Sequence, residues 1–216
     1  MCQAFRDLLV GVSSEERPFS VSQSAFRVRE KAGIIAPFYG GTRMTLETVL
    51  ETYAGYEKRA MQFYRQLSGR FADQAEVSRF WRQMSDAEAS HFAVLTLAVD
   101  WVVMAGKGTS VPDSIETILS TAALEMAKLE RAAESPSLTS RDAVRLTVSW
   151  EEEELRRILE LLPHLPEKVC GQVRAGIIGE AKKHYEGLAE LIKQVGHDEL
   201  VERVEALKTE IQTAIA

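Results

Sequence analysis

Hydrophobic residues recur three or four positions apart over most of the chain from Thr45 onward, which is the spacing of one face of an α-helix. Short breaks rich in Gly, Pro and Ser separate these stretches. The pattern predicts helices over residues 45–68, 73–105, 114–134, 140–162, 166–195 and 198–215. Alternating β-branched runs bounded by turn residues are missing, so we expect no strand. The predicted fold class is all-α, and the short connections favour a bundle of antiparallel helices.

The predicted domain organisation has three parts. Residues 1–43 mix Pro, Gly, Ser and scattered aromatic residues without a clear period, and we expect an irregular N-terminal arm there. Residues 44–163 carry four helical stretches and form the predicted four-helix bundle. Residues 164–216 add two extra C-terminal helices, which are too short to form a core of their own.

The last helical stretch carries a narrow hydrophobic seam. Its residues Leu200, Val204, Leu207 and Ile211 alternate at spacings of four and three, which is typical of contacts between two helices. The seam can pack on the bundle of its own chain or on a second chain, and both readings are open. We predict a homodimer to which the C-terminal helices contribute.

Composition and charge limit the classes of partner. Of 216 residues, 45% are hydrophobic and 27% charged, as in ordinary globular proteins. The net charge of −6 argues against nucleic-acid and anionic-membrane partners, which need a basic surface. We expect no transmembrane helix, because no run of about 18 apolar residues occurs, and no secretory signal, because the N-terminus lacks a basic region. The two cysteines, Cys2 and Cys170, lie far apart, which favours a reducing cytoplasm over a disulfide framework.

The predicted helix 73–105 carries a carboxylate and an imidazole in the middle of its apolar face. Glu88 and His91 lie three residues apart, and Trp81 and Leu95 share their side of the helix. A buried charge is costly unless it is paired, hydrogen-bonded or bound to a metal ion. Because residues three apart can reach one ion, and carboxylate and imidazole groups bind iron, manganese and zinc, this pair is a candidate metal-ligand motif.

Three further glutamates fall on apolar stripes of other predicted helices. Glu57 lies between Tyr53 and Met61 of the first helix, so its side chain is expected to face the core. Glu152 lies on a seam with Leu155 in the fourth helix. In the third helix, Glu125 competes with Met126 for the inward position. Two similar halves result, each with one glutamate on its first helix and another on its second.

These residues resemble the rubrerythrin branch of the ferritin-like superfamily. The similarity covers about residues 44–163 and rests on the glutamate of "GYEKRAMQFY" and the Glu-x-x-His of "DAEASHF", followed by two more glutamates. It implies a ferritin-like four-helix bundle that holds two iron ions between glutamates and histidines. The metal ligands that the resemblance implies are Glu57, Glu88, His91, Glu125 and Glu152.

The resemblance also implies an activity, and the chain departs from the family at one ligand. Glu88 and Glu152 are the implied bridging ligands, and Leu155 stands where the family has its second histidine. The implied function is a di-iron oxidoreductase acting on peroxide or dioxygen, or a protein of iron handling, although manganese and zinc also suit such ligands. The rubredoxin-type cysteines of full rubrerythrins are absent from this sequence, which implies an external electron donor.

Two alternatives remain open. In the first, Glu180 and His184, four residues apart on the predicted helix 166–195, supply the missing imidazole. In the second, the protein is a metal-free ferritin-like module that acts in dimerisation or partner binding, and its buried glutamates pair with neighbouring side chains. His164 and His197 fall in breaks between helices, where we expect them to be solvated. No glycine-rich phosphate-binding loop is found in the sequence.

Overall fold

Helices form nearly all of the chain that the computed structural model describes, which comprises residues 44–105 and 110–215. The α-helices are α2 (Leu46–Arg70), α3 (Ala75–Met104), α4 (Asp113–Glu134), α5 (Ser140–Leu161), α6 (Glu167–Val173), α7 (Gly179–Val195) and α8 (Val201–Ile215). Shorter turns between them are η2 (Leu162–His164), the π-helical turn η3 (Arg174–Ile178) and η4 (Asp198–Leu200). The predicted arm at residues 1–43, with Cys2, lies outside the described residues.

The all-α class is confirmed for this described part of the chain. No strand occurs in it, and its one β-type contact is an isolated bridge between Thr45 and Ser110. Five of the six predicted helices match the observed bounds to within a few residues. The predicted helix 166–195 is interrupted by η3, where hydrogen bonds close over five residues instead of four. This turn rotates the faces of α7 relative to those of α6.

Several helix ends follow local chemistry that the sequence carries. The Thr45 hydroxyl accepts a hydrogen bond from the Thr48 amide (3.3 Å) at the start of α2. The Thr139 hydroxyl accepts one from the Asp142 amide (3.1 Å) at the start of α5. Gly196 ends α7 with φ of 73°, a left-handed conformation that favours glycine.

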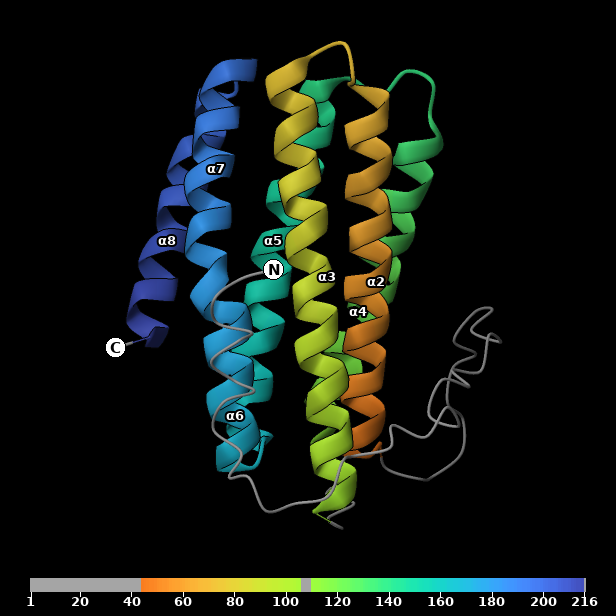
Figure 1. Cartoon of the computed structure of the whole chain (residues 1–216), viewed down its shortest axis with the longest axis vertical. Coiled ribbons are helices and arrows are strands. Elements are labelled where there is room, and N and C mark those ends of the chain that lie inside the picture. The colour runs from red at the N-terminus through yellow and green to blue at the C-terminus, as the bar shows by residue number, and fades with distance from the viewer. Residues whose placement is uncertain (1–43, 106–109, 216) are drawn as a thin grey trace, which may run out of the picture. The chain divides into compact units, whose positions relative to one another are not determined.

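The helices α2, α3, α4 and α5 stand side by side, with α7 and α8 along one side of them (Figure 1). α2 packs on α3 and α4, and α4 packs on α5. α6 and α7 pack on α3, while α7 and α8 pack on α5. As a result, α5 has helical neighbours on two sides, which matters for the orientation of its glutamates.

Polar contacts from the middle of α2 tie this helix to α4. The Arg59 guanidinium donates two hydrogen bonds to the Glu130 carboxylate, at 2.8 and 2.7 Å. The Tyr56 hydroxyl donates a buried hydrogen bond to the Leu119 carbonyl at 2.9 Å. These contacts fix the height at which α4 meets α2.

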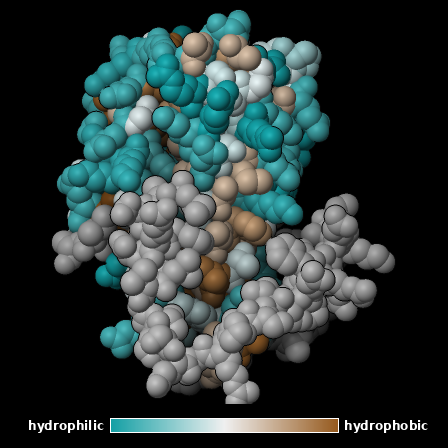
Figure 2. All heavy atoms as spheres, viewed as in Figure 1, coloured by the Kyte–Doolittle hydropathy of each residue, from teal (hydrophilic) through white to brown (hydrophobic). Residues whose placement is uncertain are grey.

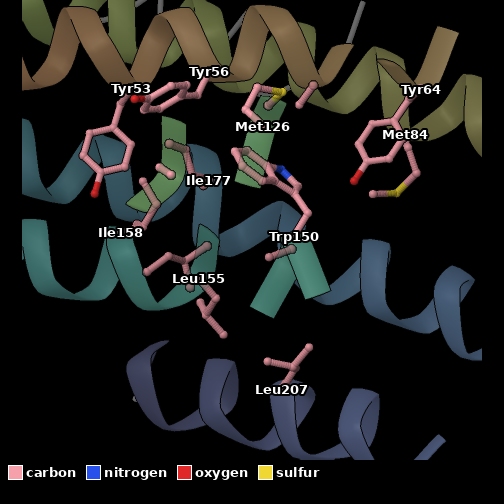
Figure 3. Close-up of a cluster of buried hydrophobic side chains, with 14 of the residues drawn as sticks. Tyr53, Tyr56, Tyr64, Met84, Met126, Trp150, Leu155, Ile158, Ile177 and Leu207 are labelled. Carbon is pink, nitrogen blue, oxygen red and sulfur yellow. The ribbon is translucent and has the colours of Figure 1, made fainter. Parts of the chain in front are cut away.

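Large aromatic and aliphatic side chains fill the interior between the helices. Figure 3 shows Tyr53 and Tyr64 pointing away from α2 into the space that also holds Trp150 and Leu155. Full burial of one such side chain contributes about 1.5–3 kcal/mol. The fold therefore rests on this apolar interior, and it tolerates a small number of polar groups inside.

The C-terminal seam is buried within its own chain. Leu200, Val204, Leu207 and Ile211 are at most 4% exposed in the single chain. α8 contacts α7 and α5 through this side, and Figure 3 shows Leu207 pointing from α8 toward the interior. Of the two readings of the seam, the structure therefore shows packing on the same chain, and the homodimer stays a prediction.

Exposed hydrophobic side chains gather toward the C-terminal end of α3, at Leu97, Val103 and Met104. The face in Figure 2 is mostly hydrophilic, with hydrophobic side chains toward its lower middle. By length and composition α3 is also apolar enough to cross a membrane, as core helices of soluble proteins are. It carries Glu88 and His91 on its buried face, in contact with other helices. The cytoplasmic location stays a prediction.

Candidate metal centre

Three of the five predicted ligands, Glu57, Glu88 and His91, lie together in the interior. Glu57 comes from α2, whereas Glu88 and His91 come from one face of α3. Nδ1 of His91 lies 3.2 Å from Oε2 of Glu88 and 3.8 Å from Oε2 of Glu57. All three residues are at most 1% exposed, so the apolar stripes correctly indicated that these side chains face the core.

The carboxylate that α5 brings to this group is Glu154. Its Oε1 lies 3.6 Å from Nδ1 of His91. Ligand atoms of Glu57, Glu88, His91 and Glu154 all lie within 4.8 Å of one another, and we call these four residues the carboxylate–histidine cluster. Glu151, one turn earlier on α5, is buried beside the cluster. Sequence reasoning missed both α5 glutamates.

Glu125 and Glu152, the other two predicted ligands, lie outside the cluster, which corrects the sequence-based expectation. Glu125 accepts a hydrogen bond from Nζ of Lys128 at 2.6 Å on a partly exposed face of α4. Glu152 pairs with Arg203 of α8 at the surface. Both carboxylates therefore have cationic partners away from His91.

The apolar pattern of α5 predicts Glu152 in place of Glu154, because this helix is buried on two sides. Leu155 lines a small cavity with Ile177 and Ala181 of the α6–α7 segment, so the hydrophobic seam of α5 points toward α7. The face toward α2 and α3 carries Glu151 and Glu154 instead. Glu151 and Glu154 are three residues apart, as Glu88 and His91 are, but Glu152 and Leu155 have the same spacing, so this signal does not single them out.

α4 contributes no carboxylate to the cluster. Its buried residues are Ile115, Leu119, Ala122, Met126 and Leu129. Met126, the alternative to Glu125, is thus the inward residue. A thioether is far less costly to bury than another carboxylate, so the α4 side of the interior is apolar.

Burial, with added repulsion between neighbouring carboxylates, raises the pKa of three glutamates in this site. Burial is the main cause for Glu88, Glu151 and Glu154, and the negative charges of neighbouring carboxylates add to it. Burial also acts on Glu57, but its contacts with Glu88 and with His91 outweigh it, so the pKa of Glu57 lies below its usual value. The pKa values of Glu57 and Glu88 are therefore shifted in opposite directions.

Two buried basic residues, His91 and Arg157, counter part of this charge. Burial favours neutral His91, but the charge of Glu88 and hydrogen bonds with its carboxylate neighbours raise the imidazole pKa well above its usual value. Arg157, one turn beyond Glu154, lies with its guanidinium 4.4 Å from the centroid of the Trp150 ring. Its positive charge opposes the rise in the pKa of Glu154 that burial and the other carboxylates cause.

Two tyrosines hold Glu151 beside the cluster. The Tyr64 hydroxyl donates a 2.6 Å hydrogen bond to Oε1 of Glu151, and the Tyr185 hydroxyl donates a 3.1 Å bond to its backbone carbonyl. Burial and nearby carboxylate charge raise the pKa of both tyrosines well above the usual value, so both hydroxyls stay protonated. The Tyr64 ring stacks on Trp81 with a centroid separation of 5.8 Å.

α7 brings a second imidazole, His184, next to the cluster. Its ring centroid lies 5.3 Å from that of His91. Burial, followed by the positive charge of His91, lowers the pKa of His184 to about 3, so this imidazole is neutral. Ligand atoms of His91, Glu180 and His184 lie within 4.8 Å of one another. The residues of the first open alternative therefore do lie beside His91.

His197 is buried, so the expectation that it is solvated is wrong. It is 0% exposed, with Nε2 2.9 Å from the Arg141 carbonyl and Nδ1 2.6 Å from the Glu199 carboxylate. These contacts tie the α7–α8 connection to the first turn of α5. His164 is exposed, as expected.

Comparisons with protein-family models, with curated proteins and with solved structures find no match for this chain. The likeness to rubrerythrins therefore stays a prediction from the sequence.

The cluster has unused ligand atoms, and this is the property that fits a metal ion. Oε2 of Glu57, Oε1 of Glu88, Oε2 of Glu154 and Nε2 of His91 are buried without a hydrogen-bond partner. Such orphaned polar atoms are rare in folded proteins and unfavourable. Carboxylate oxygens and an imidazole that converge from three helices match the ligand preferences of iron, manganese and zinc.

Proposed function

We propose that this protein binds a divalent transition-metal ion between α2, α3 and α5 and acts in redox chemistry or iron handling. One observation carries the proposal, the convergence of Glu57, Glu88, His91 and Glu154 within 4.8 Å in the interior. These four residues would hold the ion. The α5 glutamate in this set replaces the pair Glu125 and Glu152 expected from the sequence.

The charge of the cluster supports the same proposal. The raised pKa values of Glu88 and Glu154 reflect burial and the repulsion among close carboxylates. A divalent cation would take the place of their protons and remove that repulsion. The metal-free cluster is thus an unfavourable arrangement that binding makes favourable.

The order of these residues supports a ferritin-like four-helix arrangement of α2–α5. A glutamate on the first helix and Glu-x-x-His on the second are followed by Glu151-x-x-Glu154 on the fourth. Glu154, rather than Leu155, then corresponds to the second histidine of the family. Met126 stands on the third helix, where the family has a glutamate.

An iron or manganese ion in this position would supply one-electron exchange with peroxide or dioxygen, or serve as stored cargo. The surrounding side chains keep bulk water out, since the cluster residues are at most 5% exposed. The Tyr64 hydroxyl donates a 2.6 Å hydrogen bond to the buried Glu151 carboxylate and is a proton donor beside the cluster. The electron donor that the resemblance implies stays part of this proposal.

Metal content of purified variants tests the proposal. Protein stripped with a chelator is dialysed against Mn²⁺, or against Fe²⁺ without oxygen, and bound metal per chain is measured by mass spectrometry. We expect Glu154→Gln to weaken binding by more than about tenfold, because even residues that only support metal ligands matter by about 10–100-fold. Glu152→Gln removes the neighbouring surface carboxylate and should leave binding unchanged.

Helicity measured by circular dichroism separates loss of metal from loss of fold. His91→Ala should bind less metal and keep its helicity, because the fold rests on apolar packing. Equal metal content in the parent, Glu154→Gln and His91→Ala would contradict the proposed ligand set.

The second candidate function is that of a metal-free helical module that binds a partner or a second copy. The buried Arg157 and the raised pKa values of His91 and Glu88 favour it, because the guanidinium charge and bound protons would neutralise part of the cluster without a metal. The exposed hydrophobic end of α3 supplies a contact surface. A melting temperature that does not change on addition of Mn²⁺, Fe²⁺ or Zn²⁺ would favour this function over the first.

A further inference from the structure

Two buried nitrogen atoms without hydrogen-bond partners, one from α3 and one from α7, lie at the edge of the cluster. Nδ1 of His184 and Nε2 of His91 are both buried and make no hydrogen bond. The two rings lie 5.3 Å apart between centroids and are tilted by 42°. Nδ1 of His91 faces the carboxylates of Glu57, Glu88 and Glu154, which leaves Nε2 free for a contact outside the cluster.

A cavity of about 10 Å³ lies between α3, α5 and α7. Its polar lining includes His91, Glu151, Glu154 and His184, and its other walls are mainly apolar. This volume is about that of a single water molecule. The cavity is therefore large enough for one small ion and too small for an organic ligand.

The ligand atoms near His184 differ in type from those of the carboxylate–histidine cluster. His91, Glu180 and His184 offer two imidazoles and one carboxylate within 4.8 Å, whereas the cluster offers three carboxylates and one imidazole. Imidazole-rich sets suit zinc, copper and iron, while oxygen-rich sets also accept manganese and magnesium. The two sets share only His91.

We propose that His184 and Glu180 of α7, with His91, form a second metal position that adjoins the cluster and prefers zinc-like ions. This proposal rests on the proposed function, because the His91 ring lies between the two positions. The second histidine ligand of the site then comes from α7, outside the helices α2–α5. The π-helical turn η3 immediately before α7 belongs to the same cavity wall through Ile177 and Ile178.

Stoichiometric titration of the full chain with Zn²⁺ tests the second position, with visible absorption of bound Co²⁺ as an independent readout. We expect the parent to bind two Zn²⁺ ions per chain and His184→Ala to bind one. His164→Ala removes an exposed histidine and should bind two. Glu180 is partly exposed, so Glu180→Gln should leave the packing of α7 intact. This variant should bind the second Zn²⁺ ion more than about tenfold more weakly than the parent.

The outcomes separate the two proposals. One Zn²⁺ ion per chain in the parent and in His184→Ala would overturn the second position and leave the cluster site standing. No bound metal in the parent would overturn both proposals. Complete loss of metal in a folded His184→Ala variant would show a single shared site and would also overturn two positions. Should His184→Ala fail to fold, unchanged affinity of both ions in Glu180→Gln would contradict the proposal.

Discussion

The glutamates in and beside the cluster differ in pKa although their side chains are chemically identical. Glu88, Glu151 and Glu154 hold their protons to higher pH than free glutamate, because burial and neighbouring charges disfavour their anions. His91 holds its proton to higher pH because carboxylates outweigh its burial. Glu57 loses its proton at lower pH because hydrogen bonds stabilise its anion. The same residue type thus serves as acid or base according to its contacts.

The metal-free protein should lose stability as pH rises above about 4.3, the pKa of glutamate in an unfolded chain. A group whose pKa is raised on folding stabilises the native state below its unfolded pKa, and this contribution is lost as pH rises through the folded value. This sign holds for Glu88, Glu151, Glu154 and His91. Each unit of pKa shift corresponds to about 1.4 kcal/mol.

Glu88→Gln removes one of these titrations and should flatten the dependence of unfolding free energy on pH. Urea unfolding with a chelator at pH 5, 7 and 9 measures the unfolding free energy. The difference in this free energy between variant and parent should shift in favour of the variant as pH rises. Glu125→Gln, at the surface, should follow the parent. The lowered pKa values of Glu57 and His184 act with opposite sign, and parallel curves for parent and Glu88→Gln would contradict the expectation.

The path from α6 to α7 depends on a close approach to α3. Gly176 lies in the π-helical turn, and a Cβ atom there would come within 2.7 Å of Cγ2 of Val94. Val94 is one turn from His91 on α3 and has a stiff side chain. The glycine therefore lets this segment approach α3 closely enough to set His184 beside His91.

Gly176→Ala should destabilise the fold by about 1–3 kcal/mol, the usual cost of overpacking. Val94→Ala in the same chain should restore part of this loss by removing the methyl group that the new Cβ meets. Gly179→Ala is the matched control, since nothing lies within 4 Å of its Cβ, and it should be neutral or stabilising. Chemical denaturation of the parent, the three single variants and the double variant measures these effects, and additive effects of Gly176→Ala and Val94→Ala would contradict the contact.

The C-terminal helices complete the core rather than standing apart from it. α7 covers the cluster from one side and α8 covers α7 and α5. The seam residues Val204, Leu207 and Ile211 are at most 3% exposed within the single chain. The described helices accordingly belong to one compact unit.

Leu207→Ala should lower the unfolding free energy by about 2–5 kcal/mol, as for other large-to-small core substitutions. The loss should be independent of protein concentration, because the packing is within one chain. Leu124→Ala, at a residue that is 66% exposed, should change stability by less than about 0.5 kcal/mol. A loss that shrinks at higher protein concentration would instead show a contact between chains, and sedimentation of the full chain would reveal the predicted dimer.

Most of the helices follow from the sequence alone, because the spacing of apolar residues and the end signals are local. Thr45 begins α2 and Gly196 ends α7 through chemistry that lies within a few residues. The inward orientation of Glu57, Glu88 and His91 is predictable for the same reason. α2 and α3 place these residues on their apolar stripes, and a residue on the apolar stripe of a helix faces the core.

The rest of the site depends on contacts between distant parts of the chain. α5 is apolar on two sides, so its own sequence does not indicate whether Glu152 or Glu154 meets His91. That choice depends on α7 and α8, which pack on the face of α5 that carries Leu155. The opposite face of α5 is then directed toward α2 and α3. The position of His184 likewise depends on the π-helical turn and on the contact of Gly176 with Val94. Local periodicity carries no information about which face of a helix its neighbours cover, and only packing supplies it.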